Sequence, residues 1–367
     1  MFRVQNITIR FDWILLLSVL ALASVGLIIM YGIGISRPDS TLFIFRKQLL
    51  AIGIGLACLV VLAFIDARHV RGLALPIYVF GAVMLTGVLA VGRFIRGTRG
   101  WYTFGSLSFQ PVEVAKVCLV IFLASYLVRF VHSRLPLHVI AGSFFATLLY
   151  SLLVFLQPDF GSALVLFAIW GGMILFAGLP MRAFAVIAGI TAVVAACTWM
   201  FLLQPYQKQR FIAFFEPSAD ALGAGYNVKQ AGIAIGSGGW FGKGIGEGSQ
   251  SRLRFLPEAT TDFTFAVIGE ELGFIGIAFI MIMYGLLAWR FMAISGMSED
   301  DFASLVLFGA GTVFLIHILV NAGMNLGIMP VTGIPLPFIS GASSFMLASF
   351  LFIGLAESFA VHRRAAG

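Results

Sequence analysis

Charged residues are scarce in this chain of 367 residues. They make up 11% of it, against about 25% in soluble globular domains, whereas apolar residues make up 60%. The chain also has only three cysteines, Cys58, Cys118 and Cys197, and all of them lie in apolar stretches. This composition excludes an ordinary soluble fold and a disulfide framework, and we expect membrane lipids rather than nucleic acid around the protein. No Walker loop, zinc-ligand spacing or nucleophilic Ser/His/Asp pattern is found in the sequence either.

Long apolar runs dominate the chain instead. A run of about 20 apolar residues can cross a bilayer as a helix, and a helix pairs its own backbone groups where water is absent. The sequence therefore predicts an all-α polytopic membrane protein that forms a single domain over residues 1–367. The predicted spans, about ten in number, are residues 12–31, 49–65, 72–91, 112–131, 139–156, 162–178, 184–203, 263–289, 302–323 and 343–360.

The even number of spans places both termini on the same side of the membrane. The termini and short loops on that side hold ten arginines, against six basic residues in the opposite short loops, which favours cytoplasmic termini. The large loop of about residues 204–262, between spans seven and eight, is then extracytoplasmic. The basic residues on this outer side indicate an anionic ligand there.

Two charged residues lie inside the fourth span. Glu113 and Lys116 are three residues apart, so they share one face of a helix. Each such charge costs about 2.5–3.5 kcal/mol near mid-membrane on insertion scales, which makes the pair a candidate functional site. One interpretation is a structural ion pair that fixes helix packing. The other is a polar cavity in which Lys116 meets a phosphate group.

A single aspartate, Asp262, stands where a glycine-rich, basic loop meets the apolar helix that follows. As a general base it needs only water access and reach to a hydroxyl group. The alternative is a helix N-cap, a position that a neighbouring threonine would fill equally well. Glu270 and Glu271 lie about two turns further along at different angles around the helix, so we expect packing or gating contacts from them.

Basic residues cluster in the loops of the predicted outer side. Snorkelling of their long side chains towards lipid headgroups is a sufficient explanation for them. Alternatively, they form a basic rim that attracts a phosphate-bearing ligand. The members of this basic rim are Arg46, Lys47, Arg93, Arg96, Arg99, Arg210 and Lys243.

Polar residues also mark the ends of several spans. Gln-Pro pairs begin at Gln110, Gln157 and Gln204, and their equal spacing of 47 residues places them on one membrane face. Asp159 follows the second pair and precedes a span, so we expect it to cap a helix. The alternative for Asp159 is a place in the lining of the polar cavity, where Gln110 is a further candidate for substrate binding.

Two polar features accompany the last spans. Segment 329–344 is rich in proline and glycine, and such irregular backbone must line a water-filled cavity or be buried in protein. Ser343, near its end, is a candidate ligand contact. His317, Asn321 and Asn325 share one helical face, and interhelical hydrogen bonding explains them without any chemistry.

Several of these motifs resemble the SEDS family (shape, elongation, division and sporulation). The resemblance extends from the first span to the last, and the sequence of residues 238–258 looks most like that of the rod-shape (RodA) branch. The motifs that carry the resemblance are Gln110-Pro111-Val112-Glu113 with Lys116, Gln157-Pro158-Asp159-Phe160-Gly161, residues 236–271 and residues 331–340.

This resemblance implies a ten-span glycosyltransferase that polymerises Lipid II into peptidoglycan strands outside the cytoplasmic membrane of a bacterium. It also implies a class B penicillin-binding protein as transpeptidase partner, Asp262 as the essential loop aspartate, and Glu113 with Lys116 in the membrane cavity. No cofactor is evident from the sequence. A divalent cation, Mg²⁺ or Mn²⁺, would share the charge of the leaving pyrophosphate, although the sequence has no dedicated set of metal ligands.

The chain departs from the family pattern at several positions. Val112 replaces the usual serine, and Thr260 replaces a histidine two residues before the aspartate. The usual tyrosine before Gly341 is absent. The alternative functions are a flippase for the lipid-linked precursor and a scaffold without activity. Asp262 in a loop on one face favours the enzyme, since a flippase needs no catalytic carboxylate there.

Overall fold

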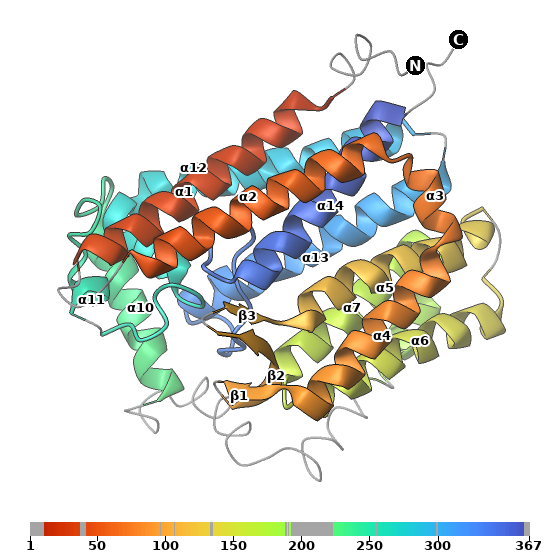
Figure 1. Cartoon of the computed structure of the whole chain (residues 1–367), viewed down its shortest axis with the longest axis horizontal. Helices are drawn as coiled ribbons and strands as arrows, with labels where there is room; N and C mark the ends of the chain where they lie inside the picture. The colour runs from red at the N-terminus through yellow and green to blue at the C-terminus, as the bar shows by residue number, and fades with distance from the viewer. Residues whose placement is uncertain are drawn as a thin grey trace.

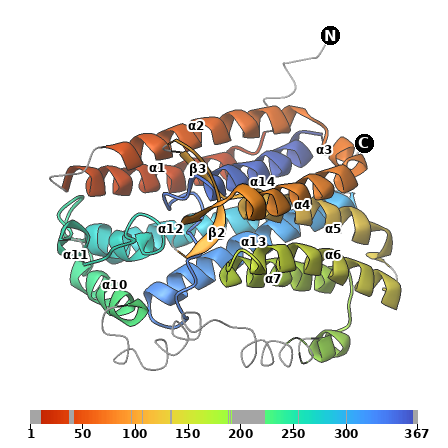
Figure 2. The same ribbon diagram turned by 60° about the horizontal axis from the view of Figure 1, so that its bottom comes forward.

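The computed structural model describes residues 11–36, 42–95, 97–105, 107–132, 135–187, 189, 191, 223–253, 255–298 and 300–362. Long helices run side by side along its long axis (Figures 1 and 2), and eight of those described are long and apolar enough to cross a membrane. The predicted all-α polytopic architecture is confirmed. The eight helices are α1 (Trp13–Ser36), α2 (Phe43–Phe64), α4 (Ala74–Val91), α5 (Pro111–Leu127, continued by η2 to Phe130), α6 (Leu137–Phe155), α12 (Thr264–Gly296), α13 (Asp301–Asn325) and α14 (Ser343–His362).

A ninth apolar helix, α7 (Phe160–Phe176), is shorter and matches the sixth predicted span. The seventh predicted span, residues 184–203, lies largely outside the described residues, as do Cys197, Gln204 and Arg210. Shorter elements complete the described part of the chain. They are α3 (Ala67–Gly72), η2 (Val128–Phe130), α10 (Ala224–Gly238), α11 (Ser249–Arg252), β1 (Arg93–Ile95), β2 (Thr98–Phe104) and β3 (Leu107–Phe109).

The connections gather at two opposite ends of the bundle, as an alternation of spans requires. At the terminal end, Arg290 of α12 pairs with Asp12, and the backbone N–H of Asp12 donates to Glu357 Oε2 at 2.9 Å. The Ser358 hydroxyl of α14 donates to the carbonyl of Ile65 at the same end. The opposite end, which we call the site end, carries the strands, α10, α11 and the segment between α13 and α14 (Figures 1 and 2).

A small antiparallel sheet in the order β1-β2-β3 connects α4 to α5 at the site end. The sequence predicted only a basic loop here, and the three strands were not expected. Arg99 in β2 donates from Nε to Gly92 O at 3.2 Å and from Nη2 to Ala90 O at 3.1 Å. Its guanidinium therefore caps the last carbonyls of α4. The backbone N–H of Arg99 also donates to Gln157 O at 3.2 Å, which joins the sheet to the loop before α7.

Helix α14 is almost entirely buried and packs closely against α2. Small residues permit this approach: a Cβ on Gly55 would lie 2.2 Å from the Phe350 ring, and a Cβ on Gly354 would lie 3.1 Å from the Cα of Leu59. Glycine at a helix contact lets two backbones come together where lipid gives no hydrophobic drive for association. The core of the bundle is thus built around the last helix of the chain.

Helix α12 is interrupted at Gly273, which has a φ of 68° and breaks the regular hydrogen-bond ladder. The loop of residues 239–244 fills the break and exchanges backbone hydrogen bonds with the helix on both sides of it. These N–H to O bonds run from Lys243 to Glu270 (2.9 Å), Gly244 to Glu271 (3.1 Å), Phe274 to Gly239 (2.8 Å) and Ile275 to Trp240 (3.2 Å).

The part of α12 after the break is sufficient to cross a membrane. At about 1.5 Å per residue, residues 274–296 are about 34 Å long, against about 30 Å for the hydrocarbon core of a bilayer. The first part of the helix, residues 264–272, can therefore project towards water at the site end. Asp262 lies directly before this projecting part.

Candidate active site

Asp262 lies in the turns that lead into α12, and its backbone is held by α13. The Nδ2 groups of Asn321 and Asn325 both donate to the Asp262 carbonyl oxygen at 3.0 Å. The Asp262 side chain is half-buried, and its Oδ2 lies 3.6 Å from the position that a Cβ on Gly333 would take. A fixed backbone and a partly exposed carboxyl group are the properties that a positioned general base requires.

The Asp262 carboxylate does not cap α12, so the N-cap interpretation is wrong for it. The N-cap residue is Phe263, which makes no side-chain cap hydrogen bond. The hydroxyl of Thr264 instead donates to Ala259 O at 3.2 Å and to Thr261 O at 3.1 Å. Local threonine chemistry therefore secures the turn, and the aspartate is not needed for it.

The proline-rich segment between α13 and α14 is buried in protein and packs against the turns before α12. Ser340 Oγ donates to Thr261 O at 2.7 Å, and Gly341 N–H donates to Thr260 O at 2.8 Å. A Cβ on Gly341 would lie 2.9 Å from that same Thr260 oxygen, so the close approach requires glycine. Tyr284 Oη of α12 donates to Pro337 O at 2.6 Å. Thr260, which replaces the family's histidine, is thus a direct neighbour of Gly341, the residue that follows the position of the missing tyrosine.

The predicted pair in α5 is a buried ion pair. Lys116 Nζ donates to Glu113 Oε2 at 2.8 Å, and both side chains are almost fully enclosed. Lys116 Nζ also lies 3.1 Å from Nε2 of His317 in α13 and 5.4 Å from the centre of the Phe345 ring. This geometry matches the structural interpretation, in which the pair fixes the packing of α5 against α13 and α14.

A second polar group joins the starts of α5, α7 and α14. Asp159 caps α7 as predicted, with Oδ1 accepting from Ser162 N–H at 3.0 Å. Its Oδ2 accepts from Gln110 Nε2 at 3.1 Å, and the Gln110 N–H donates to Ser344 Oγ at 2.8 Å. The neighbouring Ser343 Oγ is buried with no hydrogen-bond partner among the described residues. These contacts hold three helix ends together beside the segment that carries Gly333.

The members of the basic rim have different surroundings in the structure. Arg46 is exposed on α2, and the adjacent Lys47 donates to Ser108 Oγ of β3 at 3.2 Å. Arg99 is occupied by the carbonyls of α4. Arg210 lies outside the described residues. Of the described members, Arg99 therefore has a structural role, whereas Arg46 and Arg93 are exposed; Arg96, like Arg210, lies outside the described residues.

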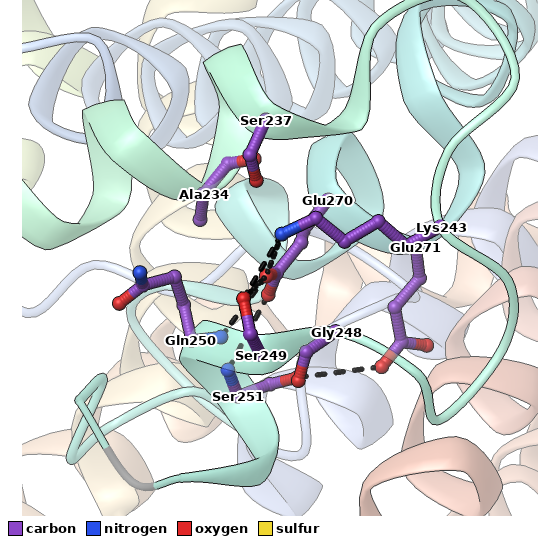
Figure 3. A network of polar contacts seen from close by, with 9 residues as sticks. All are labelled: Ala234, Ser237, Lys243, Gly248, Ser249, Gln250, Ser251, Glu270 and Glu271. Carbon is purple, nitrogen blue, oxygen red and sulfur yellow. Dashed lines mark hydrogen bonds and ion pairs between the residues drawn. The ribbon is translucent and has the colours of Figure 1, made fainter.

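Lys243 belongs to a separate polar network around the buried carboxylate of Glu270 (Figure 3). Glu270 Oε1 accepts from Lys243 Nζ at 3.0 Å, from Ser249 Oγ at 3.2 Å and from Gln250 N–H at 3.0 Å, and its Oε2 accepts from Ser251 N–H at 3.3 Å. The carboxylate thus anchors the loop of residues 243–251 to the projecting part of α12. This is a packing role, as the sequence predicted for Glu270.

The stripe on α13 is the part of the site whose importance the sequence analysis missed. The sequence predicted interhelical hydrogen bonds for His317, Asn321 and Asn325, and two of them, His317 and Asn325, do bond to α5 and α12. Asn321 donates instead to the carbonyls of Asp262 and Ile334 outside the helices, a connection that was not predicted. The available signal was a polar residue at every fourth position of an apolar span. No three His, Cys, Asp or Glu side chains converge into a metal site within the described residues.

The FtsW/RodA/SpoVE family, described as cell cycle proteins, matches residues 11–365 of the chain. The chain belongs to this family. The membership confirms the resemblance to the SEDS proteins that the sequence motifs indicated. Because the match covers nearly the whole chain, the helices around Asp262, Lys116 and Asp159 all lie within the family fold.

Two curated members of the FtsW/RodA/SpoVE family illustrate the relationship. The peptidoglycan glycosyltransferase MrdB of Escherichia coli (strain K12) is 34% identical over 360 residues, which cover 97% of this chain and 95% of MrdB. The probable peptidoglycan glycosyltransferase FtsW of Thioalkalivibrio sulfidiphilus is 36% identical over 361 residues, which cover 94% and 88% of the two chains.

Solved structures of family members share the fold. The rod shape determining protein RodA of Thermus thermophilus aligns with a TM-score of 0.73 and 29% identity over 97% of this chain and 98% of RodA. A chain from a study of how a peptidoglycan synthase complex coordinates polymerization and crosslinking aligns with a TM-score of 0.80 and 31% identity. That alignment covers 95% of this chain and 97% of the other.

Proposed function

We propose that this protein is a peptidoglycan glycosyltransferase that polymerises Lipid II into glycan strands for cell-wall elongation. Family membership and the names of the relatives support the activity, and the similarity to MrdB and to RodA supports the rod-shape branch. The observation that carries the proposal is the placement of Asp262. Its carboxyl group is half-buried at the head of the projecting part of α12, and two asparagines fix its backbone.

In the proposed reaction, a sugar hydroxyl of one disaccharide unit attacks the anomeric carbon of another. The new glycosidic C–O bond forms while the bond from that carbon to the lipid-linked pyrophosphate breaks, and the pyrophosphate leaves with the electron pair. Asp262 accepts the proton of the attacking hydroxyl. A positioned general base of this kind contributes about 10²–10⁴-fold to the rate.

The leaving pyrophosphate requires positive charge close by. Arg46 is exposed at the site end, and fixed cations stabilise charge that develops as a reaction proceeds. Lys116 is enclosed by Glu113 and His317, so we assign it no contact with the pyrophosphate. The described carboxylates and histidines offer no three-ligand set for Mg²⁺ or Mn²⁺, and the proposal routes no step through a resident cation.

The experiment compares Asp262→Asn with wild type in Lipid II polymerisation. Both proteins are reconstituted with the class B penicillin-binding protein, whose transpeptidase site is inactivated, and glycan strands are separated on a gel. We expect Asp262→Asn to lower polymerisation by at least about 100-fold, since the amide cannot accept the proton. The matched control is Glu247→Gln, which neutralises an exposed carboxylate elsewhere in the same loop. We expect this variant to retain wild-type activity.

The outcomes separate the enzyme from its base. Equal polymer from Asp262→Asn and wild type would keep the enzyme and remove Asp262 from this role. Absence of polymer from wild type in an intact complex would favour the alternative function, a flippase for the lipid-linked precursor. Placement of the aspartate at one end of the bundle, rather than along a transmembrane path, argues against the flippase.

We also place the protein in the bacterial cytoplasmic membrane, with both termini in the cytoplasm and the site end outside. The multi-pass architecture and the excess of arginines predicted on the terminal side support this orientation. The proposed partner is a class B penicillin-binding protein. The similarity to a chain of a complex that coordinates polymerization with crosslinking supports a transpeptidase partner of this kind.

A further inference from the structure

His317 lies in the C-terminal half of α13, fully buried, between the ion pair of α5 and the segment before α14. Its Nε2 lies 3.1 Å from Lys116 Nζ, and its Nδ1 lies 2.9 Å from Pro335 O. The ring of Phe345 stacks on the imidazole at 3.9 Å between centroids and 14° between planes. The histidine therefore has a partner on each nitrogen and a ring that fixes its plane.

The chemistry of these partners determines the tautomer of His317. A lysine ammonium group only donates hydrogen bonds, so Nε2 must accept. A carbonyl oxygen only accepts, so Nδ1 must carry the hydrogen and donate to Pro335. Both bonds exist together only for a neutral imidazole that is protonated on Nδ1. Neither the imidazolium nor the other tautomer satisfies both partners.

The Pro335 carbonyl lies within the segment that adjoins Asp262. Asn321, one turn from His317 on the same face of α13, donates to Ile334 O at 2.8 Å and to Asp262 O at 3.0 Å. Gly333, one residue earlier, faces the Asp262 carboxylate. Hydrogen bonds thus run from Lys116 through His317 to Pro335 O, and from the adjacent Ile334 O through Asn321 to the backbone carbonyl of the proposed base.

We propose that His317 is a positioning residue for glycosyl transfer. It joins the Glu113–Lys116 pair of α5 to residues 333–335, so the segment beside the Asp262 carboxylate keeps its place relative to α5. This inference rests on the proposed function, because the geometry that it maintains is that of Asp262. A misplacement of about 1 Å in a reacting group can cost about 100-fold in rate.

Two substitutions of His317 each keep one of its two hydrogen bonds and remove the other. In His317→Asn, the side-chain amide takes the place of Nδ1 and donates to Pro335 O, but it cannot reach Lys116. In His317→Gln, the longer side chain brings its oxygen to the place of Nε2, where it accepts from Lys116 and leaves Pro335 O without a donor. If the connection between Lys116 and Pro335 needs both hydrogen bonds of His317, both variants lose activity.

The measurement is Lipid II polymerisation with the partner present. We expect kcat to fall by at least about tenfold in both variants, with KM for Lipid II within about threefold of wild type, because an interaction that positions the base acts on the chemical step. The control is Phe302→Leu, a buried change at the opposite end of α13. It should lower the unfolding temperature to a similar extent and keep the wild-type kcat.

Three results would overturn the proposal. One is a kcat within about twofold of wild type in either variant, and another is a rise in KM alone, which would assign His317 to binding. The third is an equal loss of kcat in Phe302→Leu, which would make the loss a consequence of destabilisation.

An independent measurement tests the two hydrogen bonds of His317 without an activity assay. In ¹⁵N-histidine spectra of the intact protein, the signal that disappears in His317→Asn should show a protonated Nδ1 and an unprotonated Nε2. It should shift in Lys116→Met, which removes the donor to Nε2. A protonated Nε2 would overturn the proposal. An inactive wild type with the expected spectrum would instead remove the proposed function and leave the hydrogen bonds of His317 as structural contacts.

Discussion

Two asparagines on α13 give the Asp262 carbonyl the partners that a regular helix would have supplied. Asn321 and Asn325 are fully buried, and each contributes an Nδ2 donor to that oxygen at 3.0 Å. Asn325 Oδ1 in turn accepts from Ala266 N–H at 3.1 Å, in the first turn of α12. A buried carbonyl or amide without a hydrogen-bond partner destabilises the fold, and these side chains supply the missing partners at the point where the helix begins.

The Asn321→Asp substitution tests this arrangement with almost no change in volume. It replaces an Nδ2 donor by an oxygen that faces the carbonyls of Asp262 and Ile334. We expect a loss of about 1–3 kcal/mol in the free energy of unfolding, because the Ile334 carbonyl loses its side-chain donor and the Asp262 carbonyl keeps only Asn325, together with a marked loss of polymerisation. Unfolding is followed by intrinsic fluorescence, and polymerisation is followed on the glycan gel.

The control for that substitution makes the same chemical change at a partly exposed position. Asn227→Asp on α10 should change stability by no more than about 0.5 kcal/mol and should leave activity intact. If Asn321→Asp behaves in the same way, the asparagines do not hold the Asp262 turn.

At this scale the sequence reveals which residues are unusual but not what they contact. Asp159 was predicted as a cap because a cap is a local feature, and it is one. Arg99 and Lys243 were grouped as a phosphate-attracting rim because only their charge is visible in the sequence. Their partners, the α4 carbonyls and Glu270, are fixed by the tertiary fold, which residue type and spacing do not specify.

Among the elements, α12 departs most from the regular helix that its hydropathy predicts. Gly273 has a φ of 68°, and a Cβ there would lie 2.3 Å from Gly242 N. On the other side of the contact, a Cβ on Gly242 would lie 2.1 Å from Glu271 O. The break is therefore a backbone-to-backbone contact that only glycine permits on either side.

The Gly273→Ala substitution should be strongly destabilising, because its methyl group meets backbone rather than a flexible side chain. We expect a loss of at least about 2 kcal/mol, with a lower unfolding temperature and faster amide exchange in residues 239–244. Gly285→Ala, in the regular part of the same helix, is the matched control. A Cβ at Gly285 meets nothing within 4 Å, so this change should be neutral or stabilising by up to about 1 kcal/mol. Equal behaviour of the two variants would show that the break is not required.

The spans were predictable as elements, whereas the break and the sheet were not. Bilayer crossing needs a long apolar run, so composition alone locates helices such as α1 and α13. Hydropathy averages over a single glycine, so it does not reveal the interruption of α12 at Gly273. The strands between residues 93 and 109 are short, and their pairing depends on antiparallel register rather than on an apolar pattern.

For the whole molecule, the two ends of the bundle carry different kinds of polar contact. Around Asp262, asparagine, histidine and serine side chains bind backbone carbonyls of irregular segments, and the Lys243–Glu270 ion pair lies at the same end. The terminal end is held mainly by charged groups, with Arg290 on Asp12 and Glu357 on the Asp12 N–H, and by Ser358 on Ile65 O. The grouping of loops at two ends followed from the number and order of spans, but the contacts that close each end did not.

This division predicts that the terminal end supports stability and not catalysis. Arg290→Met strands the buried Asp12 carboxylate and should cost about 3–5 kcal/mol, because loss of one partner of a buried pair leaves an uncompensated charge. Asp12→Asn, which can still accept from Leu15 N–H, should restore part of the loss in the double variant. Below its unfolding temperature, Arg290→Met should polymerise with the wild-type kcat, since Asp262 lies at the opposite end.

The exposed hydrogen bond between His132 and Asp301 provides the comparison, because His132→Ala should cost less than about 1 kcal/mol at the same end of the bundle. Both quantities are measured on the same reconstituted samples, as unfolding temperature and as glycan polymer per unit time. A folded Arg290→Met protein with a kcat well below wild type would contradict the division. It would show that the packing of α1, α12 and α14 at the terminal end transmits its geometry along α12 to Asp262.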